Sequence, residues 1–349
     1  MTIKWIRDLA AITAAVLISG CATTTDIRAL QPAEVSEAAS LKTIGVAPFE
    51  QKGRVGVSLD SKIEAELANY QLEEGENYYR VVDRANLEKI IKEQKLQLSG
   101  LVDRKQASKI GKLSGAQALV VGNVSSAAVE DRRYREDRVK YVNCDKKGKN
   151  CTRREYTVSC IARTATVGAQ VKLTDIERGD FITANNYNQN KTWKSCEDSS
   201  ASMPSSAQGL EILADEIAST FVYRLVPHYV TFKVTLYKKS ELKLEKELAN
   251  KFESGVDFIK VGRMDRAEEI LADLMDATQG KSYAVIYNYA VIMESQGKYE
   301  DAKNLYEQAD RLTLSPEKNI NVALGRIRKI ISNHNKSMEQ ISRQAKHLE

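Results

Sequence analysis

Histidine is scarce in this sequence, with three residues in 349, at His228, His334 and His347. The sequence also has no GxSxG motif, no HExxH motif and no pair of CxxC motifs. These residues and spacings define many nucleophilic hydrolases and zinc enzymes. Their absence excludes those classes, so we expect a non-enzymatic protein with no catalytic residues, no metal site and no cofactor.

An excess of charge of one sign is also lacking. The 52 Lys and Arg residues nearly balance the 47 Asp and Glu residues, which gives a formal net charge of +5. One of these five net positive charges comes from the N-terminal segment, which contains Lys4 and Arg7 and one acidic residue, Asp8. A chain this close to balance has no global field for a polyanion, so we do not expect nucleic acid as a partner.

No apolar run reaches the length of a membrane span, and the most apolar stretch, Leu9 to Ile18, is too short. With a basic start before it, this stretch predicts a secretory signal peptide over residues 1–20. The run ends in LISGC, which resembles a bacterial lipobox and predicts a covalent lipid on Cys21. A transmembrane anchor, or an ordinary cleaved signal with a chance cysteine, is the alternative.

The residue after Cys21 is Ala22 and not the aspartate commonly associated with inner-membrane retention. The lipobox resemblance therefore implies an outer-membrane lipoprotein on the periplasmic side. Residues 21–40 are polar and contain Pro32, so we expect a tether between the lipid and the first domain.

Four cysteines remain after Cys21, and an even number in an exported protein predicts disulfides with three possible connectivities. Cys144 and Cys151 flank the polar turn DKKGKN, so this pair is favoured and leaves Cys160 with Cys196. A zinc site is the alternative, but it would lack CxxC spacing and a nearby histidine.

The stretch from Tyr79 to Val124 has the pattern of an α/β unit. Arg80 to Val82 is a short β-branched run, and Asp83 can cap a helix that has on one face Leu87, Ile90 and Ile91. A second helix is expected from Asp103 to Gly115. Ala118 to Val121 then predicts a buried strand that closes the unit.

Four motifs in this stretch, VVDR, LEKIIKEQ, SGLVD and GKLSGAQALVVGNV, resemble the signature of the CsgG/HfaB family. That family consists of lipoproteins typified by the curli secretion channel of the bacterial outer membrane. The resemblance implies an α/β domain, a mixed sheet flanked by helices, over residues 41–238. The pattern further predicts a helix over 209–225, a polar loop over 185–206 and a closing strand over 229–236.

In the secretion channels of this family two insertions form lipid-facing hairpins, and by position they match residues 125–165 and 183–206. The first insertion predicts an antiparallel hairpin crowded with basic residues: Arg132, Arg133, Arg135, Arg138, Lys140, Lys146, Lys147, Lys149, Arg153 and Arg154. Arg or Lys at the bilayer midplane costs about 2 to 4 kcal/mol each, so both insertions are predicted to stay out of the membrane. The basic hairpin is either a solvated turn or a contact with peptidoglycan or lipid headgroups.

From Glu241 to the end the sequence predicts an all-α region. The segments GRMDRA and GKYEDA begin thirty-five residues apart, at Gly262 and Gly297, which is close to the tetratricopeptide (TPR) period. We therefore expect TPR-like helical repeats with a capping helix over 241–349. By position in the repeat, a partner-binding groove would present Tyr287, Val291 and Glu294, and a purely structural array is the alternative.

Together these patterns predict a scaffolding or assembly component of cell-envelope biogenesis or secretion. Its partners would be envelope or secreted proteins, with membrane contact through the lipid and with homo-oligomerisation left open. The alternative is a subunit of a ring-forming outer-membrane secretion channel.

If Cys21 carries the lipid, metabolic labelling with palmitate will mark the wild-type protein and will be lost in Cys21→Ala, because the thiol that receives the lipid is gone. Label that survives in Cys21→Ala would contradict the lipobox interpretation.

Overall fold

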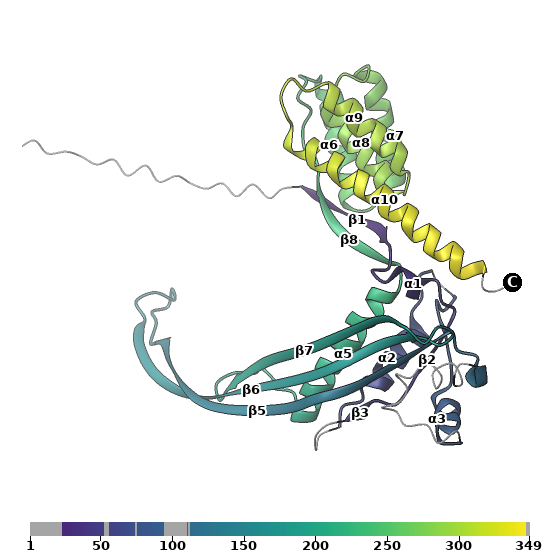
Figure 1. Cartoon of the computed structure of the whole chain (residues 1–349). Coiled ribbons are helices and arrows are strands. Elements are labelled where there is room, and N and C mark those ends of the chain that lie inside the picture. The colour runs from purple at the N-terminus through teal and green to yellow at the C-terminus, as the bar shows by residue number, and fades with distance from the viewer. Residues whose placement is uncertain (1–22, 52–55, 74, 94–109, 111, 347–349) are drawn as a thin grey trace, which may run out of the picture. The chain divides into compact units, whose positions relative to one another are not determined.

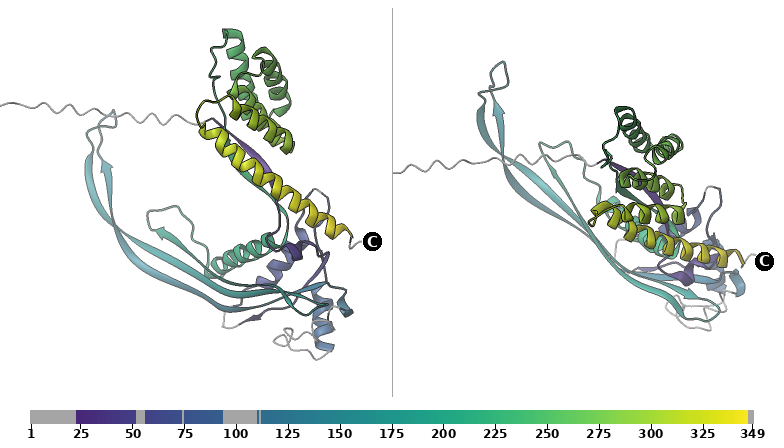
Figure 2. Two further views of the ribbon diagram at one scale, coloured as in Figure 1. Left: turned by 45° about the horizontal axis from the view of Figure 1, so that its top comes forward. Right: turned by 90° about the horizontal axis from the view of Figure 1, so that it is seen from above.

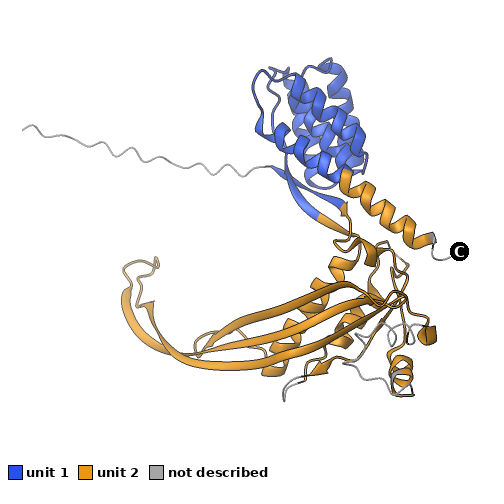
Figure 3. Cartoon of the chain, viewed as in Figure 1, with its two compact units in different colours: residues 1–29, 231–331 blue, residues 30–230, 332–349 orange. Residues whose placement is uncertain are grey.

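The computed structural model describes residues 23–51, 56–73, 75–93, 110 and 112–346 (Figure 1). These residues form two compact units, coloured separately in Figure 3. Unit 1 contains the described residues up to 29 together with 231–331, and unit 2 contains 30–230 together with residues from 332 onward. Most of the expected helix from Asp103 to Gly115 lies outside the described residues.

Unit 2 is built on a mixed six-stranded sheet. Its strands are β2 (Thr43–Val46), β3 (Glu50–Gln51), β4 (Arg80–Val81), β5 (Ala118–Val142), β6 (Thr152–Asp175) and β7 (Phe181–Cys196). The order is β4-β2-β5-β6-β7, with β3 also paired to β5. The strand β2 lies parallel to β4 and β5, whereas β5, β6 and β7 are antiparallel to one another. The predicted α/β class with a mixed sheet is confirmed.

Helices cover both faces of this sheet near the start of β5. On one face α5 (Ser206–Leu225) packs against β6, and α2 (Leu59–Asn69) packs beside it against α5, β2 and β4. This core includes alternate residues of β6, namely Ala165, Val167, Ala169, Val171 and Leu173. On the other face α3 (Arg84–Glu93) places Leu87 against Leu119, Val121 and Ile176. A short helix, α1 (Ser36–Ala39), contributes Ala38 to the first core.

The strands β5 and β6 continue well past this core. They pair from Ala118–Asp175 to Val142–Thr152, whereas β7 pairs with β6 only between Cys160 and Thr174. Beyond Cys160 the two strands therefore form a two-stranded ribbon, which extends past the end of β7 in both views of Figure 2. The expected antiparallel hairpin is present, and its second strand runs without a break into the strand expected at 166–173.

Two segments differ from the sequence prediction, because their strand conformation depends on pairing with a distant strand that the local sequence pattern does not reveal. Residues 24–31, expected within the tether, form β1 (Thr24–Gln31), in which Ile27, Ala29 and Leu30 are buried. The strand β8 (His228–Thr235), expected to close the main sheet, instead pairs with β1 in a separate two-stranded sheet.

The prediction of a polar loop at 185–206 is also wrong over its first half, because residues 185–196 belong to β7. This strand lies at the edge of the sheet and turns one face to solvent, so its sequence is mostly polar. Ile182, Tyr187 and Trp193 of β7 pack against the core under α5.

Unit 1 contains a series of packed helices. They are α6 (Lys246–Lys260), α7 (Met264–Ala277), α8 (Tyr283–Ser295), α9 (Tyr299–Arg311) and the first half of α10 (Lys318–Lys346). Gly262 and Gly297 follow α6 and α8 with a φ of 78° each, a left-handed conformation that favours glycine. Consecutive helices from α6 to α9 pack on one another, so the predicted all-α region is confirmed.

A buried ionic network lies inside unit 1. Glu294 is fully buried on α8, and its two carboxylate oxygens accept hydrogen bonds of 2.8 Å each from the guanidinium of Arg326. The Tyr306 hydroxyl donates to Glu294 Oε2 at 2.6 Å. Burial lowers the pKa of Arg326, but the hydrogen bonds and charge of Glu294 outweigh this effect and raise the pKa, so the guanidinium stays charged.

The second half of α10 belongs to unit 2 and holds its partners through glutamine side chains. Gln340 accepts from the Ala33 amide at 2.9 Å and donates to the Ala33 carbonyl at 3.2 Å. Gln344 Nε2 donates to the carbonyl oxygens of Leu41 and Tyr78 at 2.8 and 2.9 Å. These hydrogen bonds satisfy the peptide groups of Ala33, which precedes α1, of Leu41, which follows it, and of Tyr78, which precedes β4.

The replacement Glu294→Ala should destabilise the protein by about 3 kcal/mol, because it leaves the largely buried guanidinium of Arg326 unpaired. Urea unfolding followed by circular dichroism measures the loss. The matched control Glu253→Ala, at an exposed position on α6, should stay within about 0.5 kcal/mol of wild type.

The double variant Glu294→Ala with Arg326→Met should recover much of this loss, since no charge is then left buried. A single variant as stable as the control would contradict the role of the network.

Candidate functional site

The expected lipidation site, Cys21, lies outside the described residues together with the expected signal peptide. Lipidation therefore stays a prediction. Among the helices of the described residues, none is both long enough and apolar enough to cross a membrane.

The four remaining cysteines form two disulfides, both on the hairpin ribbon or at its base. Cys144 is bonded to Cys151 across the turn between β5 and β6. Cys160 is bonded to Cys196, its register partner on β7. This connectivity is the one that the sequence favours, and it fixes both ends of the ribbon covalently.

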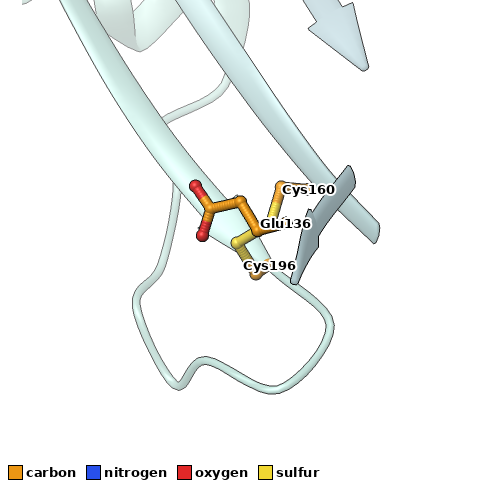
Figure 4. Close-up of side chains that lie close together, drawn as sticks. All are labelled: Glu136, Cys160 and Cys196. Atoms are coloured by element: carbon orange, nitrogen blue, oxygen red, sulfur yellow. A yellow bond between two sulfur atoms is a disulfide. The ribbon is translucent and has the colours of Figure 1, made fainter. Parts of the chain in front are cut away.

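The zinc alternative for these cysteines does not fit the structure. Within the described part of the chain, Glu136, Cys160 and Cys196 bring possible metal-ligand atoms within 4.8 Å of one another. Figure 4 shows the Glu136 carboxylate beside the disulfide between the two cysteines. Because a metal is bound by thiolates and not by disulfide sulfurs, this cluster is not a zinc site.

Two arginines hold the segment that follows β7 against strands β5 and β6. Arg138 donates to Asp198 Oδ1 at 2.8 Å, and the Tyr156 hydroxyl donates to Asp198 Oδ2 at 2.7 Å. Arg163 forms two hydrogen bonds to Asp131, of 2.7 and 2.6 Å, and a third to the Pro204 carbonyl at 2.8 Å. The hydrogen bonds from Arg163 lower the pKa of Asp131, so this carboxylate stays charged.

At the far end of the ribbon a single carboxylate organises the turn. Asp145 accepts hydrogen bonds from the backbone amides of Lys147 and Lys149 at 2.9 and 2.8 Å, and from Asn150 Nδ2 at 3.1 Å. The hydrogen bond from the Lys149 amide has the largest effect on the pKa of Asp145 and lowers it, and the bond from the Lys147 amide lowers it further. Asn143 and Asn150 adopt a φ of 53° and Gly148 a φ of 70°, the left-handed conformations that close the turn.

The three residues expected to line a repeat groove are all buried. Tyr287 is 1% exposed, and Val291 and Glu294 are fully buried. The Tyr287 hydroxyl donates to the Thr235 carbonyl of β8, and Glu294 binds Arg326 of α10. The face that the repeat pattern assigns to a partner is thus occupied within unit 1 by β8 and α10, so these residues do not form an accessible groove.

An accessible cleft of about 490 Å³ does lie elsewhere in unit 1, between the segment after β8 and α6. Its apolar lining is Leu242, Leu244, Phe252 and Val256, and its polar lining includes Lys238, Lys239 and Lys260. An open surface for a partner within unit 1 is therefore available here and not at Tyr287.

The contacts of His228 are made with its near neighbours in the sequence. The His228 ring lies against Tyr223 with 3.5 Å between ring centres, and burial lowers its pKa. Its Nδ1 lies at hydrogen-bond distance from the Val226 carbonyl, just before β8 begins, so this contact is a local structural one.

The sequence did not predict the Glu294 network. A lone glutamate in the mostly apolar α8 was a signal of a buried partner.

One family model matches the chain. Residues 54–133 match the family described as curli production assembly/transport component CsgG. The match confirms the family resemblance for this segment, which includes the whole stretch from Tyr79 to Val124. No curated protein matches the chain.

Several solved structures share a distant likeness to the chain. The C-terminal domain of LpoB from Salmonella enterica is 14% identical over 45% of this chain and 95% of its own, with a TM-score of 0.25. PelC from Paraburkholderia phytofirmans, solved as a dodecamer, is 13% identical over 58% of this chain and 97% of its own, with a TM-score of 0.26. Lipoprotein GNA1162 from Neisseria meningitidis is 15% identical over 52% and 98%, with a TM-score of 0.25. At scores this low, the function of this chain has to be argued from its own residues and from the CsgG match to residues 54–133.

Proposed function

We propose that this protein is a non-enzymatic lipoprotein of the outer membrane that faces the periplasm and scaffolds an assembly of envelope biogenesis or secretion. The observation that carries the proposal is the match of residues 54–133 to the CsgG family, within a sheet domain that the same chain joins to a helical unit. A sheet domain and a helical unit in one chain give it two surfaces for binding other proteins.

The cysteine chemistry supports the compartment. Two disulfides in one chain are typical of an oxidising environment such as the bacterial periplasm. The apolar leader that ends in LISGC is typical of the export signal of a bacterial lipoprotein, and the lipid on Cys21 would hold the mature protein at the membrane.

The helical unit supports a TPR-like role in partner binding. The two left-handed glycines at 262 and 297 follow α6 and α8 at the spacing of the repeat. With Tyr287, Val291 and Glu294 buried, we assign partner binding in this unit to the cleft beside Leu242 and Phe252. An envelope or secreted protein with an apolar segment would fit such a surface.

One observation favours the alternative, a ring-forming secretion channel. The strands β5 and β6 are 25 and 24 residues long, and their outer halves extend beyond the core as a hairpin. The charges of this hairpin oppose a lipid-facing role, because basic residues near the bilayer midplane are costly.

Detergent-purified full-length protein separates the two functions. The scaffold proposal expects no stepwise ion conductance in planar lipid bilayers, and it expects a photoreactive residue at position 242 to cross-link to an envelope protein identified by mass spectrometry. The same probe at exposed Asn321 of α10 serves as the matched control. Closed rings that conduct ions would instead establish the channel and overturn the scaffold.

A further inference from the structure

The turn of the long hairpin holds a local excess of positive charge. We define the hairpin tip as residues 140–154, which include six Lys or Arg residues and one Asp. Its formal charge of +5 equals that of the entire chain, so the rest of the sequence is balanced. A partner that recognises charge would therefore be drawn to this tip and not to the protein as a whole.

The one acid of the tip does not neutralise its lysines. Asp145 spends its oxygens on the backbone amides of Lys147 and Lys149 and on the Asn150 amide. The side chains of Lys146, Lys147 and Lys149 are exposed and take part in none of the ion pairs among the described residues, whereas Arg153 pairs with Glu155 at 2.8 Å, just outside the tip. The disulfide between Cys144 and Cys151 and the bonds to Asp145 thus hold these three lysines on a fixed frame.

Cations also face each other across the ribbon. Lys140 lies directly opposite Arg154 in the register, an arrangement that is destabilising for like charges. The Lys140 ammonium lies 5.3 Å from the centre of the Tyr156 ring, and among the described residues it forms no ion pair. An anionic partner would relieve this repulsion, which the free hairpin does not.

Apolar side chains accompany these cations. Tyr141 is 66% exposed and Val139 is 41% exposed, on the opposite face of β5 from Lys140. Tyr141 lies opposite Arg153 in the register. Tyrosine beside lysine and arginine is the combination that proteins place at the headgroup level of a membrane, where one end of the ring is apolar and the other is hydrated.

The distribution of the cations indicates the shape of the partner. Lys140 and Arg154 lie on one face of the ribbon, Arg153 lies on the other, and three lysines surround the turn. A linear polyanion laid along the face of Lys140 and Arg154 would miss Arg153 on the other face. A planar surface met end-on would reach them all.

We propose that the hairpin tip docks end-on on an anionic phospholipid surface, with its lysines and arginines at lipid phosphates and Tyr141 at the headgroup level. The contact goes beyond the proposed scaffolding function, and it does not depend on the lipid at Cys21.

The test uses the chain from residue 21 onward with Cys21→Ser, so that no covalent lipid contributes. Vesicles of phosphatidylcholine, with or without one third phosphatidylglycerol, are sedimented with the protein. We expect binding to the anionic vesicles only. Each lysine near an anionic surface contributes about 1 kcal/mol, so the triple variant K146Q/K147Q/K149Q should bind about 100-fold more weakly.

The matched control K243Q/K246Q/K251Q removes the same net charge from exposed positions on and before α6, and it should bind as the wild type does. An equal loss in both variants would reduce the effect to net charge and overturn the proposal. Binding that does not distinguish the two kinds of vesicle would also overturn it, as would co-sedimentation with isolated peptidoglycan in place of vesicles.

An independent readout comes from Tyr141→Trp. Docking with position 141 at the headgroup level predicts a blue shift of the fluorescence of this tryptophan on anionic vesicles, relative to the wild-type spectrum, and the shift should disappear when K146Q/K147Q/K149Q is added. A spectrum unchanged by vesicles would place position 141 in water and contradict end-on docking. Circular dichroism of each variant verifies that the fold is retained.

Discussion

The antiparallel ladder between β5 and β6 is the constraint on which the sheet domain depends. It joins a buried core at Ala118 to an exposed turn beyond Val142 through one continuous register. A register shift lies between Val124 and Ser126. Before it, even-numbered Val120 and Val124 face the core under α5, and after it odd-numbered Ala127 and Val129 do so. The extra residue thus keeps one face of β5 apolar, and it also determines which side chains share a face at the tip.

The sequence predicts best where local pattern and tertiary partner agree. Asp83, expected as a helix cap, accepts a hydrogen bond from the Asn86 amide at 3.0 Å at the start of α3. The run at Ala118 becomes a central strand because both of its faces meet helices, as its uninterrupted apolar pattern requires. In β1 and β7 the pattern is weak, since an edge strand needs few apolar residues and receives its conformation from the neighbouring strand.

Spacing along a helix shows which residues share a face but not what covers that face. Tyr287, Val291 and Glu294 do lie on one side of α8, as their spacing of four and three residues predicts. In this chain β8 and α10 contact that side, through Thr235 and Arg326. Both partners are distant from α8 in sequence, and the repeat pattern contains no information about them. The same spacing therefore yields a groove in one chain and a core in another.

The net charge of the chain does not show where its charged residues are concentrated. A net charge of +5 spread over 349 residues predicts no field, yet fifteen consecutive residues, those of the hairpin tip, carry an equal charge. At physiological salt, charges interact over about 8 Å, so a partner responds to the tip and not to the balanced remainder. The long ladder carries the tip past the part of the sheet that the helices cover, and the disulfide at Cys144 keeps its cations together. A nearly neutral protein can thus present a strongly basic contact, because the hairpin separates the charges that the composition averages.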